Sequence, residues 1–161
     1  MKTNPEILAL EHAHAACKVH DEALGDALED IGQWPITETQ LDHLTKDQRR
    51  LLDQFAYRYT RLQDALGARL MPAALRALGE DIEIMPALDR FNRLEQLGWL
   101  PSADEWLELR RIRNEFAHDY PEMAKERFDQ LQLALAAARR AREIFNFLGQ
   151  KVLQRLAAAK R

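Results

Sequence analysis

The side chains best suited to chemistry are concentrated in one stretch, residues 109–121. Arg113 carries a planar guanidinium, which can hold a phosphate and the charge that grows on it in a transition state. His118 follows five residues later, and imidazole groups titrate close enough to neutral pH to accept or donate a proton. Asn114 lies one helical turn before His118 and could orient the imidazole or cap the helix end. The stretch therefore predicts acid–base chemistry on a phosphate.

A helix must position these groups, because the apolar side chains of the stretch recur at helical spacing and form one stripe toward the core: Trp106, Leu109, Ile112 and Phe116. Arg113 and His118 are five residues apart, so an ideal helix turns them about 140° away from each other. Pro121 disfavours the helical conformation at Tyr120. We therefore expect the chain to unwind near His118, so that the terminal side chains turn toward Arg113 or toward a second subunit.

Each of these residues also has a structural interpretation. His118 suits a helix C-terminus, where positive charge is favourable. Arg113 could lie beside the apolar stripe or pair with Glu115 or Asp119, and Tyr120 could fill the edge of the core. The residues alone leave both interpretations open.

The stretch Arg113–Tyr120 reads Arg-x4-His-x-Tyr, which resembles the signature of the HEPN family, particularly the toxin of HEPN/minimal-nucleotidyltransferase toxin–antitoxin pairs. Asn114 after Arg113 also fits the usual form of that signature. The resemblance extends loosely over residues 45–148, where the runs 57–64 and 94–98 are similar to toxins of this group. The first 44 residues show no such resemblance.

The resemblance implies an all-helical, generally dimeric endoribonuclease that needs no metal or other cofactor. In such enzymes the ribose 2′-OH attacks the neighbouring phosphate, and the Arg and His meet in a cleft across the twofold axis. Carried over to this sequence, Arg113, Asn114 and His118 would be catalytic. Tyr120 would accept AMP from the partner nucleotidyltransferase, which silences the ribonuclease because a bulky anion beside the cleft repels RNA. The implied partners are RNA, the nucleotidyltransferase antitoxin and a second copy of the chain.

Further cations are expected to contact RNA: Arg58, Arg61, Arg110 and Arg111. Arg111 and His118 also satisfy a wider Arg-x6-His spacing, which resembles that of other HEPN relatives. Arg58 and Arg61 precede Asp64 on a long predicted helix, and all three could line the same cleft. Such a helix face is nevertheless more often simply solvated.

Two other classes of function compete with the ribonuclease. The first is a non-catalytic helical module that binds or regulates a nucleotidyltransferase through the same polar cleft. The second is a carboxylate di-iron bundle, since Glu11-x-x-His14 and Glu115-x-x-His118 are paired ligands of that kind. The predicted helix 46–70 contains no Glu, so the additional ligands are missing and no metal site is expected.

Composition places few limits on function. The chain has 161 residues, of which 47% are apolar, enough for one domain with a substantial core. Its net charge of −3 is uneven, because residues 1–45 are acidic and residues 139–161 are basic, which predicts pairing between the two ends or contact with a phosphate backbone. Cys17 is the only cysteine, so no intramolecular disulfide can form. With no recognisable leader or membrane span, we expect a cytoplasmic protein.

Helix formers dominate and no segment reads as a strand. The predicted helices cover about residues 5–31, 46–70 with a kink or break at Pro72, 72–78, 86–97, 103–118, and a final helix that begins after Pro121 and reaches at least Leu148. Thr37, Thr45 and Ser102 each begin a capping-box pattern. The sequence predicts an all-α, up-and-down bundle of four to five main helices. Its parts are an extra N-terminal helix (1–44), a HEPN-like core (45–148) and a basic C-terminal extension (149–161).

Overall fold

The computed structural model describes residues 4–118 and 122–161, and every regular element in these ranges is helical. The elements are α1 (Pro5–Gln33), η1 (Thr39–Asp42), α2 (Lys46–Ala65), η2 (Leu66–Leu70), α3 (Met71–Ala77), η3 (Ile82–Ile84), α4 (Ala87–Gln96), α5 (Ala103–His118) and α6 (Ala124–Ala159). The prediction of an all-α bundle is confirmed.

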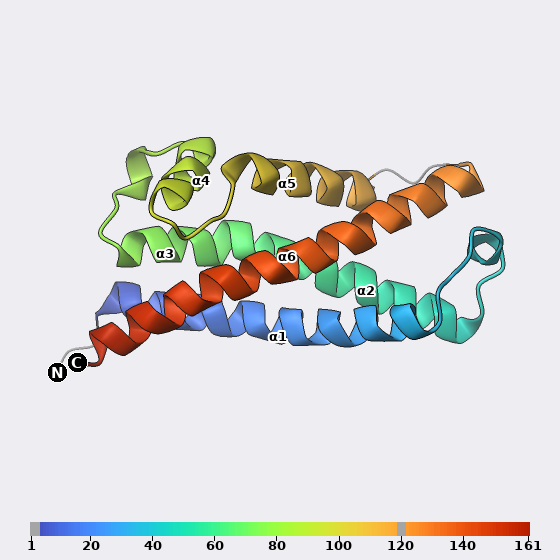
Figure 1. The fold of residues 1–161 in the computed structure, drawn as a ribbon, viewed down its shortest axis with the longest axis horizontal. Coiled ribbons are helices and arrows are strands. Elements are labelled where there is room, and N and C mark those ends of the chain that lie inside the picture. Colours follow the sequence, from blue (N-terminus) through green and yellow to red (C-terminus); the bar gives the residue numbers. More distant parts are fainter. Residues whose placement is uncertain (1–3, 119–121) are drawn as a thin grey trace.

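The long helices pack together into one bundle (Figure 1). Helix α1 packs along α2, and α6 crosses them diagonally on its way back to the end where the chain begins. Helix α5 packs on α6 and α2, and α4 connects it to α3. Buried side chains from all six α-helices merge into one core cluster. None of the described helices is long and apolar enough to cross a membrane.

Short-range signals in the sequence set most helix ends. Thr45 accepts a hydrogen bond from the backbone N–H of Gln48, whose side chain accepts one from the N–H of Thr45, so the predicted capping box begins α2. Gly79 and Gly98 take left-handed φ angles of 83° and 78° just after α3 and α4. Glycine adopts this conformation without the steric cost that a Cβ would bring.

The predicted break at Pro72 does not occur. The chain remains helical from residue 46 to residue 77, because η2 is a π-helical turn directly ahead of the proline. The Met71 N–H donates to the Leu66 carbonyl, five residues back. A proline in a regular helix clashes with the carbonyl four residues earlier, and the wider π turn relieves that clash.

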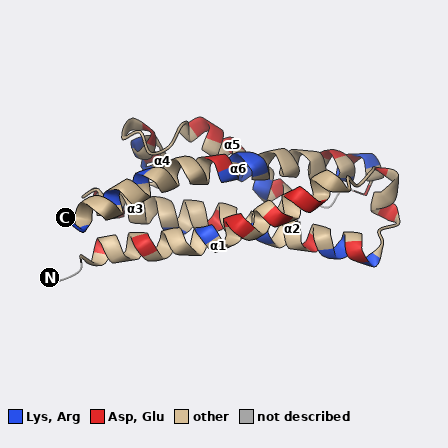
Figure 2. Cartoon of the chain, turned by 60° about the horizontal axis from the view of Figure 1, so that its bottom comes forward, with Lys and Arg blue, Asp and Glu red and all other residues tan. Residues whose placement is uncertain are grey.

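Helix α6 also runs past Gly149 without a break, so the expected basic extension is the last part of one 36-residue helix. A Cβ at residue 149 would lie 3.2 Å from His14 Nε2, which explains a glycine at this approach of α6 to α1. Acidic residues are spread along α1 and basic residues gather at the middle of α6 (Figure 2). Arg142 donates to Asp21 over 2.9 Å between α6 and α1, so the predicted pairing of the two charged ends occurs at this contact.

Candidate functional site

Helix α5 holds the motif rigidly in the bundle. Trp106 and Leu109 are buried, and Ile112 and Phe116 pack against the core from one side, as their spacing predicted. The Glu105 N–H donates to the Ser102 hydroxyl over 3.1 Å. The carboxylate of Glu105 binds Arg140 of α6 instead of closing the capping box, with distances of 2.8 and 2.9 Å. The start of α5 is therefore capped and also tied to α6.

Arg113 faces α2. Its Nη2 donates to Asp64 Oδ2 over 2.7 Å, and its side chain is only 17% exposed. Its Nε is buried and has no hydrogen-bond partner among the described residues. Of the carboxylates expected to pair with Arg113, Glu115 binds Arg111 instead, and Asp119 lies outside the described residues. Arg113 is thus fixed at one end of its guanidinium, and one donor remains unused.

Beside Arg113 lies a pocket of about 260 Å³ between α2, η2, α4 and α5. Its lining is Gln63, Asp64, Gly67, Ala68, Ala87, Phe91, Arg110, Arg113 and Asn114. Gln63 and Phe91 are buried and form its floor, whereas Arg110, Asn114 and Asp64 are exposed and form part of its rim. The pocket therefore opens to solvent past charged and amide groups. We call it the Arg113 pocket.

Asn114 and His118 are exposed on the outer side of α5. At about 100° per residue, Asn114 lies about 100° around the helix from Arg113, and His118 a further 40°. Helix α5 is described as far as His118, and residues 113–118 are all helical. The residues directly after His118, where the chain was expected to unwind, lie outside the described residues. Tyr120 lies outside the described residues.

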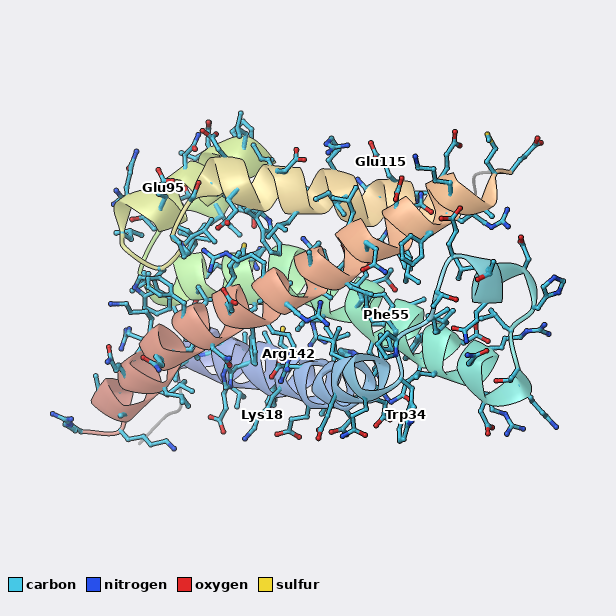
Figure 3. The ribbon with its side chains drawn as sticks, turned by 45° about the vertical axis from the view of Figure 1, so that its right-hand side comes forward. Lys18, Trp34, Phe55, Glu95, Glu115 and Arg142 are labelled. Atoms are coloured by element: carbon cyan, nitrogen blue, oxygen red, sulfur yellow. The ribbon has the colours of Figure 1, made fainter. Side chains whose placement is uncertain are left out.

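The four arginines predicted to contact RNA have different surroundings. Arg110 lines the Arg113 pocket, and its guanidinium carbon lies 5.2 Å from the centre of the Phe91 ring. Arg111 is paired within its own helix to Glu108 and Glu115. The hydrogen bond from Arg111 to Glu108 holds the pKa of that carboxyl below its usual range. Figure 3 shows Glu115 on the outer side of α5. Arg111 is therefore already neutralised.

Arg58 and Arg61 do not line the Arg113 pocket. Arg58 contacts His20 Nδ1 of α1 over 3.1 Å, and both arginines lie over the Tyr57 ring, at 5.3 and 5.2 Å from its centre. The expectation that they share a cleft with Asp64 is therefore wrong for this pocket. They form a separate basic and aromatic patch on the α1/α2 side.

A second hollow, of about 510 Å³, is lined by α2, the last turn of α5, the start of α6 and the segment between α1 and α2. It is mostly apolar, with Phe55, Phe116 and Leu131 among its lining. Thr60 lines it one turn before Asp64, and Ala117 lines it one turn after Arg113. The two hollows therefore lie end to end along the α2/α5 groove, and the last turn of α5 borders the second one.

Sequence reasoning missed the polar groups that α2 buries against α5. Both amide atoms of Gln63 and the hydroxyl of Tyr59 are buried without a partner among the described residues. Burial raises the pKa of Tyr59 well above its usual value, and the nearby Arg113 partly offsets this effect. The one available signal was Gln63 itself, a polar residue next to the apolar seam of α2.

The described residues contain no group of three His, Cys, Asp or Glu side chains that could hold a metal ion. His14 of the first Glu-x-x-His pair stacks on Phe145 with the ring centres 5.3 Å apart. Burial between α1 and α6 lowers its pKa, and the charge of Lys18 lowers it further.

Comparison of the chain with protein-family models, with curated proteins and with solved structures found no match. The HEPN resemblance therefore depends on the motif residues and on their setting in the fold.

Proposed function

We propose that the protein is a metal-independent endoribonuclease, the toxin of a HEPN/nucleotidyltransferase pair. One observation carries this proposal. Arg113 is held by Asp64 at the wall of an open pocket and shares the pocket with Asn114. His118 follows at the exposed end of the same helix. A phosphate-binding cation and a proton-transfer group thus belong to one surface element.

The reaction needs only these groups. The 2′-oxygen bonds to phosphorus, the bond from phosphorus to the 5′-oxygen breaks, and a proton moves from the 2′-OH to solvent or base while another reaches the leaving oxygen. The imidazole of His118 is suited to carry one of these protons. The guanidinium of Arg113 is suited to stabilise the negative charge that grows on the phosphate oxygens.

Two copies of the chain would complete the site. Within one copy, Arg113 and His118 point about 140° apart and are separated by about 7.5 Å along the helix. A twofold axis beside α5 would bring Arg113 of one copy near His118 of the other, and each dimer would then contain two equivalent sites. The proposed enzyme is therefore a homodimer with composite sites.

The first test is RNA cleavage in excess chelator. We expect Arg113→Ala and His118→Ala to lose about 100-fold or more of the wild-type rate. The matched control is His43→Ala, because His43 is an exposed histidine outside both hollows. Equal cleavage by wild type and His118→Ala would remove the catalytic assignment.

Mixing the two inactive variants tests the composite site. A heterodimer of Arg113→Ala with His118→Ala contains one intact site if the groups come from different copies, and none if they come from the same copy. We expect co-expressed, affinity-purified heterodimers to regain a large part of the activity of one site. A mixture that stays inactive, or a wild-type protein that light scattering shows to be monomeric, would contradict the composite site.

Toxin control is tested by co-expression with a minimal nucleotidyltransferase, taken from the adjacent gene where that gene encodes one. We expect the mass of the protein to increase by AMP units, and this increase to disappear in Tyr120→Phe. The competing function is a non-catalytic binding module, which the separation of Arg113 and His118 within one chain favours. That function predicts nucleotide or protein binding that is retained in His118→Ala, with no cleavage by either protein.

A further inference from the structure

The floor of the Arg113 pocket contains an amide that no protein group uses. Gln63 is 2% exposed, and neither its Nε2 nor its Oε1 has a hydrogen-bond partner among the described residues. A buried polar group left unpaired is costly, and most such groups in proteins find partners. Both atoms are also closed to solvent in this conformation, so a ligand in the adjoining open pocket would satisfy them once the side chain turns toward it.

The walls around Gln63 are built from small residues. Gly67 and Ala68 line the pocket from the π turn η2, and Ala87 lines it from the start of α4. A Cβ on Gly67 would lie 3.2 Å from Trp106, so η2 and α5 are in close contact beside the pocket. Single π turns inside long helices often occur at functional sites. Here the turn presents two residues with little or no side chain where a ligand would enter.

Size and charge restrict the occupant. The volume of about 260 Å³ is below the range of pockets for drug-sized ligands but exceeds several times the share of one water molecule. Arg110 and Arg113 place two cations at the wall and rim against the one carboxylate of Asp64, and the net positive charge favours a ligand that carries phosphate. A carboxamide offers one donor and one acceptor side by side, and it pairs with two atoms of adenine at once.

We infer that the Arg113 pocket is a base-recognition subsite, in which the Gln63 side chain turns into the pocket and its carboxamide pairs with one adenine of bound RNA while Arg110 and Arg113 face the adjoining phosphates. This inference rests on the proposed function for its substrate class. It makes Gln63 a specificity residue that contacts the base, not a residue that takes part in bond breaking.

Binding of RNA that cannot be cleaved tests the subsite without relying on catalysis. The probes are short fluorescein-labelled 2′-O-methyl oligonucleotides in which only the central nucleotide carries a base, and fluorescence anisotropy gives their Kd. We expect wild type to bind the adenine probe about tenfold more tightly than the other three. In Gln63→Leu the adenine probe should bind no more tightly than the others. Gln54→Leu, a matched change at an exposed glutamine of α2, should keep the preference.

Stability measurements distinguish a variant that has lost the contact with the base from one that has failed to fold. Leucine has no polar atoms to leave unpaired, so Gln63→Leu should unfold at the same temperature as wild type or higher. Gln63→Met is a second variant of similar volume with a flexible side chain. Equal affinity of wild type for all four probes, or an adenine preference that survives in both folded variants, would overturn the subsite. Adenine-selective binding without cleavage would overturn the ribonuclease alone, and cleavage without base preference would overturn the subsite alone.

Discussion

The ion pair between Asp64 and Arg113 leads to a measurable prediction for Asp64→Asn. The pair joins α2 to α5 across 49 residues of sequence over 2.7 Å. Arg113 is 17% exposed but Asp64 is 54% exposed, so solvent screens much of the attraction. Pairs of this kind contribute about 0.5–1 kcal/mol to the free energy of unfolding. For a chain of this size, that loss corresponds to a decrease in Tm of about 1–4 °C.

The assay is reversible thermal unfolding followed by circular dichroism at low salt and in 1 M NaCl. Asp53→Asn is the matched control, because Asp53 is exposed on the same helix and forms no ion pair with a described residue. High salt should reduce the difference in Tm between the two variants, since the Debye length is only about 3 Å at this concentration and exposed charges farther apart than that are largely screened. A double-mutant cycle with Arg113→Gln should give a coupling energy of about 0.5–1 kcal/mol. Equal Tm values for Asp64→Asn and Asp53→Asn at low salt would refute the assigned role of the pair.

The same substitution should strengthen RNA binding if the proposed function is right. Asp64 places a negative charge on the rim of the pocket, where it competes with phosphate for the Arg113 guanidinium. Two unit charges about 4 Å apart in water interact by about 1 kcal/mol, which corresponds to about a fivefold decrease in Kd. Unchanged or weaker binding of non-cleavable RNA by Asp64→Asn would show that the carboxylate does not compete with the ligand.

Three further predictions concern the scaffold. Thr45→Ala removes the hydroxyl that caps α2 and should lower the free energy of unfolding by about 1 kcal/mol in urea titrations. Burial lowers the pKa of His14, so the folded state favours the neutral ring. The free energy of unfolding should therefore keep its full contribution from this residue above pH 6.5, the usual pKa of histidine. It should fall as the pH decreases below that value. His20, whose pKa is also lowered, has the same sign, and the fall should be smaller in His14→Gln. Cys17 is fully buried, and burial raises its pKa to about 12. It should resist alkylation in the native protein and react after unfolding.

The helices could be predicted well because local signals set their ends. The capping box at Thr45 and the left-handed glycine at Gly98 act within a few residues, so the sequence contains the whole signal. The absence of a break at Pro72 could not be predicted, because the effect of a proline depends on the hydrogen-bond register of the preceding turn. The π turn that accommodates Pro72 leaves no recognisable pattern in the composition.

The site was only partly predictable for a related reason. Arg113, Asn114 and His118 were found because they are close in sequence. Asp64 and Gln63 become part of the site only through the packing of α2 against α5, and their orientation depends on that interface. Periodicity placed Arg58 on α2 but did not show that it faces α1.

The packing of the last turns of α5 decides how the proposed site must assemble. Phe116 lies between Arg113 and His118, and the centre of its ring is 5.9 Å from that of Phe55 and 5.6 Å from that of Tyr59. Unwinding the turn to bring His118 toward Arg113 would pull Phe116 away from these rings and remove apolar surface from the core. Pairing two intact copies requires no such loss, because each helix keeps its packing while the second chain supplies the missing group. Restored cleavage in the heterodimer of Arg113→Ala and His118→Ala is therefore the expected result, and it follows from the packing of Phe116 as much as from the motif.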